Sequence, residues 1–461
     1  MRSSPPPPPT GVPGCCAPSP TASRPTAPSW CPWPTARPPS ACRAWKASST
    51  TTFQLRAFAA LLEAGDADTF LDEAPVAGAP PAGRPRMTRV RAPLGPVAMF
   101  AASNFPFAFS VAGGDTASAL AAGCPVVVKA HPAHPDLSRQ VAAICARAVA
   151  GQGLPAGVFQ FVQGASIEVG VHLVQAPAIA AVAFTGSFKG GTALAKIAGE
   201  RPRPIPFYGE LGSINPLVVL PAAAEQDGEA LAQTLAGSIC LGAGQFCTSP
   251  GVIVVFDDAA GDAFVQALSV RLATLEPHAM LTGGIRGAFD RGVAAWRGHG
   301  RLRVLVDDAS QASGAAAPPR PFLAQVSARD FIADHRLHEE VFGAAALVVR
   351  VDSHARAADV LEAVGGTLTV TLWGVPAGTE APDADTLSLV RTAIRVAGRV
   401  LFSGVPTGVA VTAAQHHGGP FPASTAPFTT SVGHAALERF QRPLALQDAP
   451  AWLLARRGAA V

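Results

Sequence analysis

The sequence predicts an α/β protein in which a doubly wound, Rossmann-type dinucleotide-binding domain is followed by a second α/β domain. Short β-branched or apolar runs alternate with helical patterns from Leu94 onward, which is typical of parallel β-α-β units. A glycine turn at residues 186–191 follows the fourth predicted strand and opens a helix, as phosphate-binding turns do. With 461 residues and 49% apolar content, the chain can form two or three domains with a large core.

The predicted elements follow each other in a regular order. In the first domain we expect strands at residues 96–101, 125–129, 158–162 and 179–184, and helices at residues 113–122, 137–150 and 167–175. In the second domain we expect strands at residues 217–220, 252–256 and 347–351, and helices at residues 228–240 and 262–275. The sequence contains no recognisable internal repeat.

The first fifty residues differ in kind from the rest. They hold 14 of the 44 prolines, four of the eight cysteines and three of the six tryptophans, with five basic residues and no acid. Disordered tails favour charged, aromatic-poor sequence, so we interpret residues 1–50 as an out-of-frame or wrongly started translation. A disordered proline-rich tail is the alternative. Expectations about the fold therefore begin near Thr51.

Charge and hydropathy argue against nucleic-acid and membrane partners. Residues 51–461 carry 30 basic and 32 acidic side chains, a net charge of −2, which is not the basic footprint of a nucleic-acid-binding protein. The longest apolar runs, such as residues 342–349, are far shorter than the ~20 residues of a membrane span. Met1 and Arg2 precede a proline run rather than an apolar signal region, so we expect a cytoplasmic protein with free cysteines.

Residues 241–248 place Cys247 in a glycine-rich loop between a predicted helix and a predicted strand. Such a loop can expose a thiol, and its free backbone N–H groups can stabilise a thiolate, which favours a nucleophile. The alternative for a single cysteine is a small buried hydrophobe, and we assign Cys240 and Cys124 to that class.

Glu210 lies among apolar and glycine residues in the segment 207–212. Partial burial there predicts a raised pKa for the Glu210 carboxyl group, toward the range useful for a general base. A solvated loop glutamate is the alternative.

The turn that begins at Gly186 and ends at Gly191 lacks the usual G-x-G-x-x-G fingerprint, so its position carries more weight than its sequence. Ser187 is expected at the start of the following helix, near a bound phosphate. An ordinary helix cap is the alternative for Ser187.

Two histidine pairs, His131 with His134 and His416 with His417, have spacings that resemble metal ligands. Prolines flank the first pair, and no carboxylate or cysteine cluster in the sequence completes either site. We therefore expect no metal site.

Five strings in the sequence occur in the order found in the aldehyde dehydrogenase superfamily, which the chain therefore resembles. They are Ser103-Asn104-Phe105-Pro106, Phe184-Thr185-Gly186-Ser187, Gly209-Glu210-Leu211-Gly212, Gly244-Gln245-Phe246-Cys247-Thr248 and Glu339-Glu340-Val341-Phe342-Gly343. Residues 113–117, 128–135 and 404–409 further resemble the α-ketoglutaric semialdehyde (2,5-dioxopentanoate) dehydrogenase branch. The resemblance covers roughly Thr51 to the C-terminus.

The resemblance implies an aldehyde dehydrogenase-like fold. It implies a dinucleotide-binding domain over residues 51–220 with an oligomerisation hairpin at 71–93, a catalytic domain over 221–415, and a C-terminal return and oligomerisation segment over 416–461. A strand near residues 451–454 is expected to take part in a homo-oligomer, either a dimer or a tetramer. Family members carry further helices and strands upstream of the Thr51 region, so the N-terminal part of the cofactor domain is expected to be missing.

The resemblance also implies the chemistry of individual residues. Cys247 attacks the aldehyde, the Asn104 amide and the Cys247 backbone N–H hold the oxyanion, and Glu210 activates the water that hydrolyses the thioester. The cofactor, NADP or NAD, is expected to contact residues of the strand ends and loops: Lys129 at the adenosine ribose, Gly186, Ser187 and Gly191 at the pyrophosphate, Glu340 at the nicotinamide ribose and Phe342 near the ring.

The implied function is NAD(P)-dependent oxidation of an aldehyde, with 2,5-dioxopentanoate as the expected substrate and 2-oxoglutarate as the product. CoA-dependent relatives generally lack the glutamate base, so Glu210 favours release of a free acid. Two alternatives stay open. The substrate could be a medium- or long-chain aliphatic aldehyde, and the chain could be a truncated, catalytically silent remnant that at most binds a nucleotide.

Overall fold

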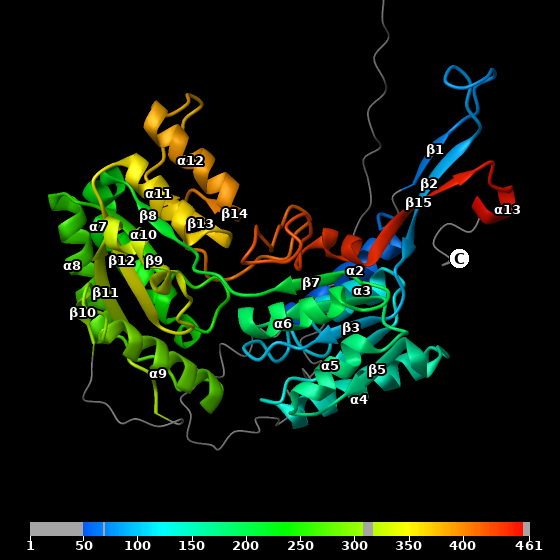
Figure 1. The fold of residues 1–461 in the computed structure, drawn as a ribbon, viewed down its shortest axis with the longest axis horizontal. Coiled ribbons are helices and arrows are strands. Elements are labelled where there is room, and N and C mark those ends of the chain that lie inside the picture. Colours follow the sequence, from blue (N-terminus) through cyan, green and yellow to red (C-terminus); the bar gives the residue numbers. More distant parts are fainter. Residues whose placement is uncertain (1–48, 68–69, 308–316, 455–461) are drawn as a thin grey trace, which may run out of the picture. The chain divides into compact units, whose positions relative to one another are not determined.

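A computed structural model of the protein describes residues 49–67, 70–307 and 317–454. The expected anomalous segment, residues 1–50, lies almost entirely outside the described residues. Within them, three β-sheets form: five-stranded, seven-stranded and three-stranded (Figure 1). The first helix of the described residues, α2 (Ser49–Glu63), packs against α3 (Gly114–Ala121) and buries Phe58 in the core of the first domain.

The five-stranded sheet is parallel throughout and has the strand order β5-β4-β3-β6-β7. Its strands are β3 (Val97–Phe100), β4 (Val126–Lys129), β5 (Phe159–Val162), β6 (Ala181–Thr185) and β7 (Phe207–Glu210). Successive side chains of a strand point to opposite faces. Helices α3 and α4 (Pro135–Gly151) cover one face, and α5 (Ile167–Gln175) and α6 (Phe188–Gly199) cover the other. The predicted doubly wound domain is thereby confirmed, with β7 as a strand that we did not predict.

The strand order reverses between β3 and β6, because β4 and β5 lie on one side of β3 and β6 and β7 lie on the other. In open α/β sheets, ligands bind outside the carboxyl ends of the strands at such a reversal. Asn104 follows β3 and Ser187 follows β6, so both lie at this point of the sheet. A short η2 turn (Ala156–Val158) leads into β5.

The seven-stranded sheet has the order β10-β11-β12-β9-β8-β13-β14 and is parallel except for the pairing of β10 with β11. Its strands are β8 (Leu217–Val219), β9 (Val252–Phe256), β10 (Arg303–Val306), β11 (Phe322–Ser327), β12 (Ala345–Val351), β13 (Thr367–Trp373) and β14 (Ala397–Leu401). Helices α7 (Pro221–Cys240) and α8 (Ala259–Thr274) cover one face. The other face is covered by α9 (Gly283–Arg297), α10 (Ala328–Ala333), α11 (His354–Val364) and α12 (Ala384–Val396).

The position of β8 corrects the expected domain boundary. β8 pairs with β9 and β13, so it belongs to the second domain, where its strand pattern was predicted, whereas the domain bounds that the resemblance implies placed residues 217–220 in the first. The chain therefore passes between domains after β7 rather than after β8. The predicted strands and helices of the second domain are confirmed within a few residues, except that α7 begins at Pro221.

The three-stranded sheet is antiparallel, with β2 (Met87–Pro93) between β1 (Leu71–Glu73) and β15 (Gln441–Gln447). The expected hairpin at residues 71–93 is therefore present. The expected strand near residues 451–454 is wrong, because that segment is the short helix α13 (Ala451–Leu454) and the pairing strand is β15. From Pro443 to Gln447 of β15, exposed and half-buried residues alternate, as they do in a strand with one face on a neighbour.

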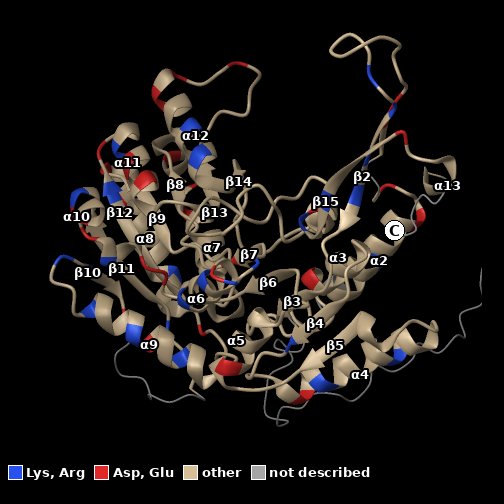
Figure 2. Cartoon of the chain, turned by 45° about the vertical axis from the view of Figure 1, so that its right-hand side comes forward, with Lys and Arg blue, Asp and Glu red and all other residues tan. Residues whose placement is uncertain are grey.

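Charged side chains of both signs occur on the same elements (Figure 2). Arg286 pairs with Asp290 on α9, and Arg356 pairs with Asp359 on α11. None of the helices in the described ranges has both the length and the apolar character needed to cross a membrane.

Candidate active site

A tight loop places Cys247 at the junction of the two domains. After α7 the chain forms the turn η3 (Leu241–Gly244), in which Gly242, Ala243 and Gly244 have φ values of 59°, 58° and 69°. A side chain at Gly244 would collide with the backbone of Gly343, so only glycine allows this approach. The Asn215 amide then donates hydrogen bonds to the carbonyls of Cys247 at 2.8 Å and Ser249 at 3.0 Å, which fixes the loop beyond the turn.

Glu210 is the last residue of β7 and is buried, with 6% of its surface exposed. Its Oε2 accepts a hydrogen bond from the Ser431 hydroxyl at 2.7 Å. Its Oε1 lies 3.1 Å from His417 Nε2. The backbone of Glu210 also forms an isolated β-bridge with Ser424, so β7 and its carboxylate both contact the C-terminal segment.

The pKa of the Glu210 carboxyl group is shifted in the direction opposite to the one predicted from the sequence. Burial raises the pKa of the carboxyl group, as predicted, but the charge of His417 and hydrogen bonds from His417, Ser431 and Cys247 lower it by more. The net result is a lowered pKa, and the expected rise is wrong. Glu210 is therefore a carboxylate near neutral pH, which is the form that accepts a proton.

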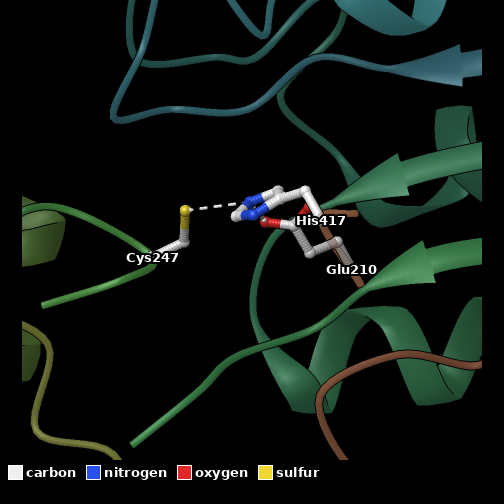
Figure 3. A group of neighbouring side chains, drawn as sticks. All are labelled: Glu210, Cys247 and His417. Atoms are coloured by element: carbon white, nitrogen blue, oxygen red, sulfur yellow. Dashed lines mark hydrogen bonds and ion pairs between the residues drawn. The ribbon is translucent and has the colours of Figure 1, made fainter. Parts of the chain in front are cut away.

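His417 lies between Glu210 and Cys247 (Figure 3). Its Nε2 is 3.5 Å from Cys247 Sγ as well as 3.1 Å from Glu210 Oε1. We set His417 aside because the sequence completes no cluster around it, and that reason is wrong. Potential ligand atoms of Glu210, Cys247 and His417 all lie within 4.8 Å of one another, close enough to hold a metal ion. The signal was missed because the three residues are distant in sequence.

Cys247 is half-buried, and its thiol is neutral in this arrangement. Burial raises the pKa of the thiol well above its ordinary value, and the negative charges of Glu210 and Glu340 raise it further. A thiol must lose its proton to act as a nucleophile, so Cys247 needs a neighbouring base.

Asn104 lies beside the Cys247 loop. Its side-chain amide donates a hydrogen bond to the Gln245 carbonyl at 3.1 Å, and the rings of Phe105 and Phe246 meet edge to face at 5.0 Å. The segment after β3 thus contacts the loop that carries Cys247. The Asn104 amide, which we expect to bind the oxyanion, here donates its hydrogen bond to the protein backbone.

The glycine turn joins the end of β6 to α6. Ser187 caps α6, because its Oγ accepts a hydrogen bond from the Gly190 N–H at 3.3 Å, so the capping interpretation holds whatever else Ser187 does. A Cβ at Gly191 would lie 2.1 Å from Leu211 Cδ2, so the helix can pack here only without a side chain. The Gly186 N–H donates to the Glu210 carbonyl at 3.0 Å, which ties this turn to the strand that carries Glu210.

Lys129 ends β4, at the same edge of the sheet as the glycine turn. It is half-buried, and burial lowers the pKa of its ammonium group. The lysine thus stands beside the region where the parallel strands end.

Glu340 and Phe342 line a cleft together with Ser213, Gly244 and Phe246. Much of the Glu340 side chain is exposed to solvent in this cleft. The surrounding protein nevertheless removes water from its carboxyl group, and this desolvation raises the pKa to about 8. A hydrogen bond from the Ser213 backbone acts in the opposite direction and lowers the pKa. A Cβ at Gly212 would lie 2.8 Å from Glu340 Oε2, so Gly212 allows this approach.

Comparison with known proteins gives consistent matches. Residues 48–286 match the aldehyde dehydrogenase family. The α-ketoglutaric semialdehyde dehydrogenase 2 of Azospirillum brasilense is 45% identical over 88% of this chain and 76% of its own length. The α-ketoglutaric semialdehyde dehydrogenase of Acinetobacter baylyi is 41% identical over 87% of this chain and 75% of its own length.

Solved structures of low sequence identity share the fold. Glyceraldehyde-3-phosphate dehydrogenase GapN from Methanocaldococcus jannaschii, complexed with NADP, has a TM-score of 0.66 at 19% identity over 86% of this chain and 80% of that one. An NAD-dependent aldehyde dehydrogenase from Sinorhizobium meliloti has a TM-score of 0.64 at 23% identity, over 80% of this chain and 70% of that one.

Proposed function

The chain belongs to the aldehyde dehydrogenase family, and we propose that this NAD(P)-dependent aldehyde dehydrogenase oxidises 2,5-dioxopentanoate to 2-oxoglutarate. The observation that carries the proposal is the meeting of Cys247 and Glu210 across the domain junction, at the carboxyl edge of the first sheet. The substrate is supported by the two relatives named for α-ketoglutaric semialdehyde, at 45% and 41% identity.

The residues at the sheet edge fit a dinucleotide. The glycine turn leads from the carboxyl end of β6 into α6, and the N-terminus of a helix favours a bound phosphate. Ser187 and the turn from Gly186 to Gly191 would hold the pyrophosphate and Lys129 the adenosine ribose. Glu340 and Phe342 would hold the nicotinamide end. The bound dinucleotide supplies a hydride acceptor.

In the proposed reaction, the Cys247 thiolate forms a bond to the aldehyde carbon, and the carbonyl oxygen becomes an oxyanion. The Asn104 amide exchanges its bond to Gln245 for that oxyanion and holds it together with the Cys247 backbone N–H. Loss of hydride from the same carbon leaves a thioester on Cys247. Glu210 takes a proton from water as the water attacks the thioester, the C–S bond breaks, and the free acid leaves.

The test is turnover of the purified full chain with 2,5-dioxopentanoate, followed by cofactor reduction and by chromatographic detection of 2-oxoglutarate. We expect one acid formed for each cofactor reduced. A long-chain aliphatic aldehyde is the comparison substrate. Absence of turnover with the dioxo acid, or a higher kcat/KM for the aliphatic aldehyde, overturns the assigned substrate. Absence of turnover with every aldehyde would instead support the alternative that the chain is a catalytically silent remnant.

We also infer that the protein is a cytoplasmic homo-oligomer. The sheet of β1, β2 and β15 supports assembly, because β15 lies at one edge with a backbone free to pair, and Leu71 is 50% exposed on β1. The four described cysteines, Cys124, Cys145, Cys240 and Cys247, are free thiols, which suits a reducing compartment. Light scattering of the full chain tests the assembly, and an active monomer would contradict it.

A further inference from the structure

The loop that follows β14, residues 402–412, is fixed next to the helix that leads to Cys247. Thr407 Oγ1 shares a hydrogen bond with Ser238 Oγ at 2.5 Å, and Ser238 lies in the last turn of α7. Trp373 Nε1, at the end of β13, donates to the Gly404 carbonyl at 2.7 Å. The loop therefore has a defined position near the end of α7, from which the chain reaches Cys247 through η3.

Arg399, in the middle of β14, holds this loop with one of its guanidinium nitrogens. Its Nη2 donates to the carbonyls of Pro406 at 2.9 Å and Gly408 at 3.4 Å. Its Nε is buried and makes no hydrogen bond with any residue that the structure describes. The half-buried side chain thus keeps donor capacity that the loop does not use.

Arg399 shares a face of the second sheet with a residue that supports the Cys247 loop. It lies opposite Thr369 of β13 in the parallel register, and residues paired in this way point their side chains to one face. Thr369 Oγ1 donates to Asn215 Oδ1 at 3.1 Å, and the Asn215 amide donates to the Cys247 carbonyl at 2.8 Å. A short chain of hydrogen bonds therefore leads from the register partner of Arg399 to the Cys247 loop.

The positive charge of Arg399 has no acidic partner within residues 49–67, 70–307 and 317–454. The more deeply buried Arg350 and Arg439, in contrast, each pair with aspartates. Burial lowers the pKa of the Arg399 guanidinium, while the charge that Cys247 carries as a thiolate raises it, so the two side chains are close enough to interact. A partly buried cation without a counter-ion costs free energy, and a negatively charged ligand beside Cys247 would gain this cation as its partner.

We propose that Arg399 selects the substrate, with its guanidinium binding the carboxylate at the far end of an aldehyde acid whose aldehyde carbon lies at Cys247. The proposal rests on the proposed function. An arginine can bind a carboxylate through two parallel N–H donors, and Nε is a donor that the loop leaves available. The Glu210 carboxylate disfavours a second negative group beside it, so the acid end of the substrate gains by lying at Arg399 rather than at Glu210.

The experiment compares two aldehydes in the full chain. One is 2,5-dioxopentanoate, and the other is pentanal, which has the same number of carbons and no carboxylate. In Arg399→Met we expect kcat/KM for the dioxo acid to fall about thirtyfold or more, mainly through a higher KM, because the ion pair is made in the bound ground state as well as in the transition state. For pentanal, kcat/KM should stay within about threefold. Arg399→Lys keeps the charge and should recover part of the loss with the dioxo acid.

A purely structural role of Arg399 gives a different result. If Arg399 only supports the loop, Arg399→Met lowers kcat/KM for both aldehydes alike, and the proposal is wrong. Unchanged kcat/KM for the dioxo acid also overturns it. Arg201→Met is the matched control, because Arg201 is half-buried and donates to the carbonyls of Ile179 and Ala176, which lie before β6 and away from Cys247. This control should keep the preference between the two aldehydes.

A measurement without turnover separates this proposal from the proposed function. If the unmutated protein oxidises neither aldehyde, the proposed function fails, and protection of Cys247 from iodoacetamide then decides the role of Arg399. The probe is 4-oxopentanoate, a ketone with a terminal carboxylate that cannot be oxidised to an acid, and 2-pentanone is its uncharged counterpart. We expect 4-oxopentanoate to slow alkylation more than 2-pentanone does, and Arg399→Met to remove this difference. Equal protection by the two ketones in the unmutated protein overturns the role of Arg399.

Discussion

Arg439 of η5 (His434–Phe440) and Asp115 in the first turn of α3 form an ion pair in which each side chain is only 4% exposed. The Arg439 guanidinium also lies 4.8 Å from the centre of the Phe440 ring. This pair fastens the C-terminal return, and with it the segment of His417 and Ser431, to the helix that follows β3.

We predict that Asp115→Asn destabilises the protein strongly, because it leaves the buried Arg439 charge without its partner. The expected loss is about 3–5 kcal/mol of the free energy of unfolding. The midpoint of urea unfolding measures it. A double variant, Asp115→Asn with Arg439→Met, removes both charges and should recover part of the loss. A single variant that unfolds at the urea concentration of the unmutated protein would show that the pair contributes little.

Cys247→Ala should abolish aldehyde oxidation while dinucleotide affinity stays within a few-fold, because the thiol forms the covalent intermediate and is not among the proposed cofactor contacts. Steady-state turnover and a fluorescence titration with NADPH measure the two properties separately. Cys240→Ala, at the end of α7, is the matched control and should keep turnover. If Cys247→Ala still oxidises the aldehyde, Cys247 is not the nucleophile.

Glu210→Gln should slow hydrolysis of the thioester more than hydride transfer, because glutamine cannot accept a proton from water. Rapid mixing with aldehyde should then reveal a burst of reduced cofactor, followed by a slow steady state. Unchanged steady-state turnover would mean that another group activates the water.

The stability of the protein should fall as the pH drops below the ordinary histidine range. Burial, and then the charges of His134 and Lys129, lower the pKa of His131 from 6.5 to about 4. Between these values the unfolded chain binds a proton that the folded protein does not, so stability rises with pH across this window. His131→Gln should flatten the dependence of Tm on pH there. The same slope in both proteins would assign the effect to other groups.

The cofactor preference should favour NADP at least as much as NAD. The exposed Pro132 lies three residues after the strand-end lysine, and it carries no carboxylate that would repel a 2′-phosphate at this position. Lys129 remains as a cation for that phosphate. Pro132→Glu should shift kcat/KM toward NAD. A preference for NAD of about tenfold or more in the unmutated protein would contradict the prediction.

Local sequence pattern predicted much of the fold. Apolar runs of four or five residues predict β3, β9 and β12, because strands buried on both faces need nearly continuous apolar sequence. Three of the seven strands of the second sheet were predicted, and β7 was missed, because its glycine and glutamate do not resemble a strand.

Cys247, Glu210, Lys129 and Ser187 were also singled out from the sequence, because a reactive thiol, a base and a phosphate turn each depend on a short local motif. The sequence by itself thus determined the fold class, the family resemblance and the candidate residues that lie within such motifs. The position of His417 was decided only by the tertiary structure, which brings together residues 170 positions apart in sequence. The direction of the Glu210 pKa was decided there as well, because burial and a neighbouring histidine act in opposite directions, and only the folded arrangement determines which is larger.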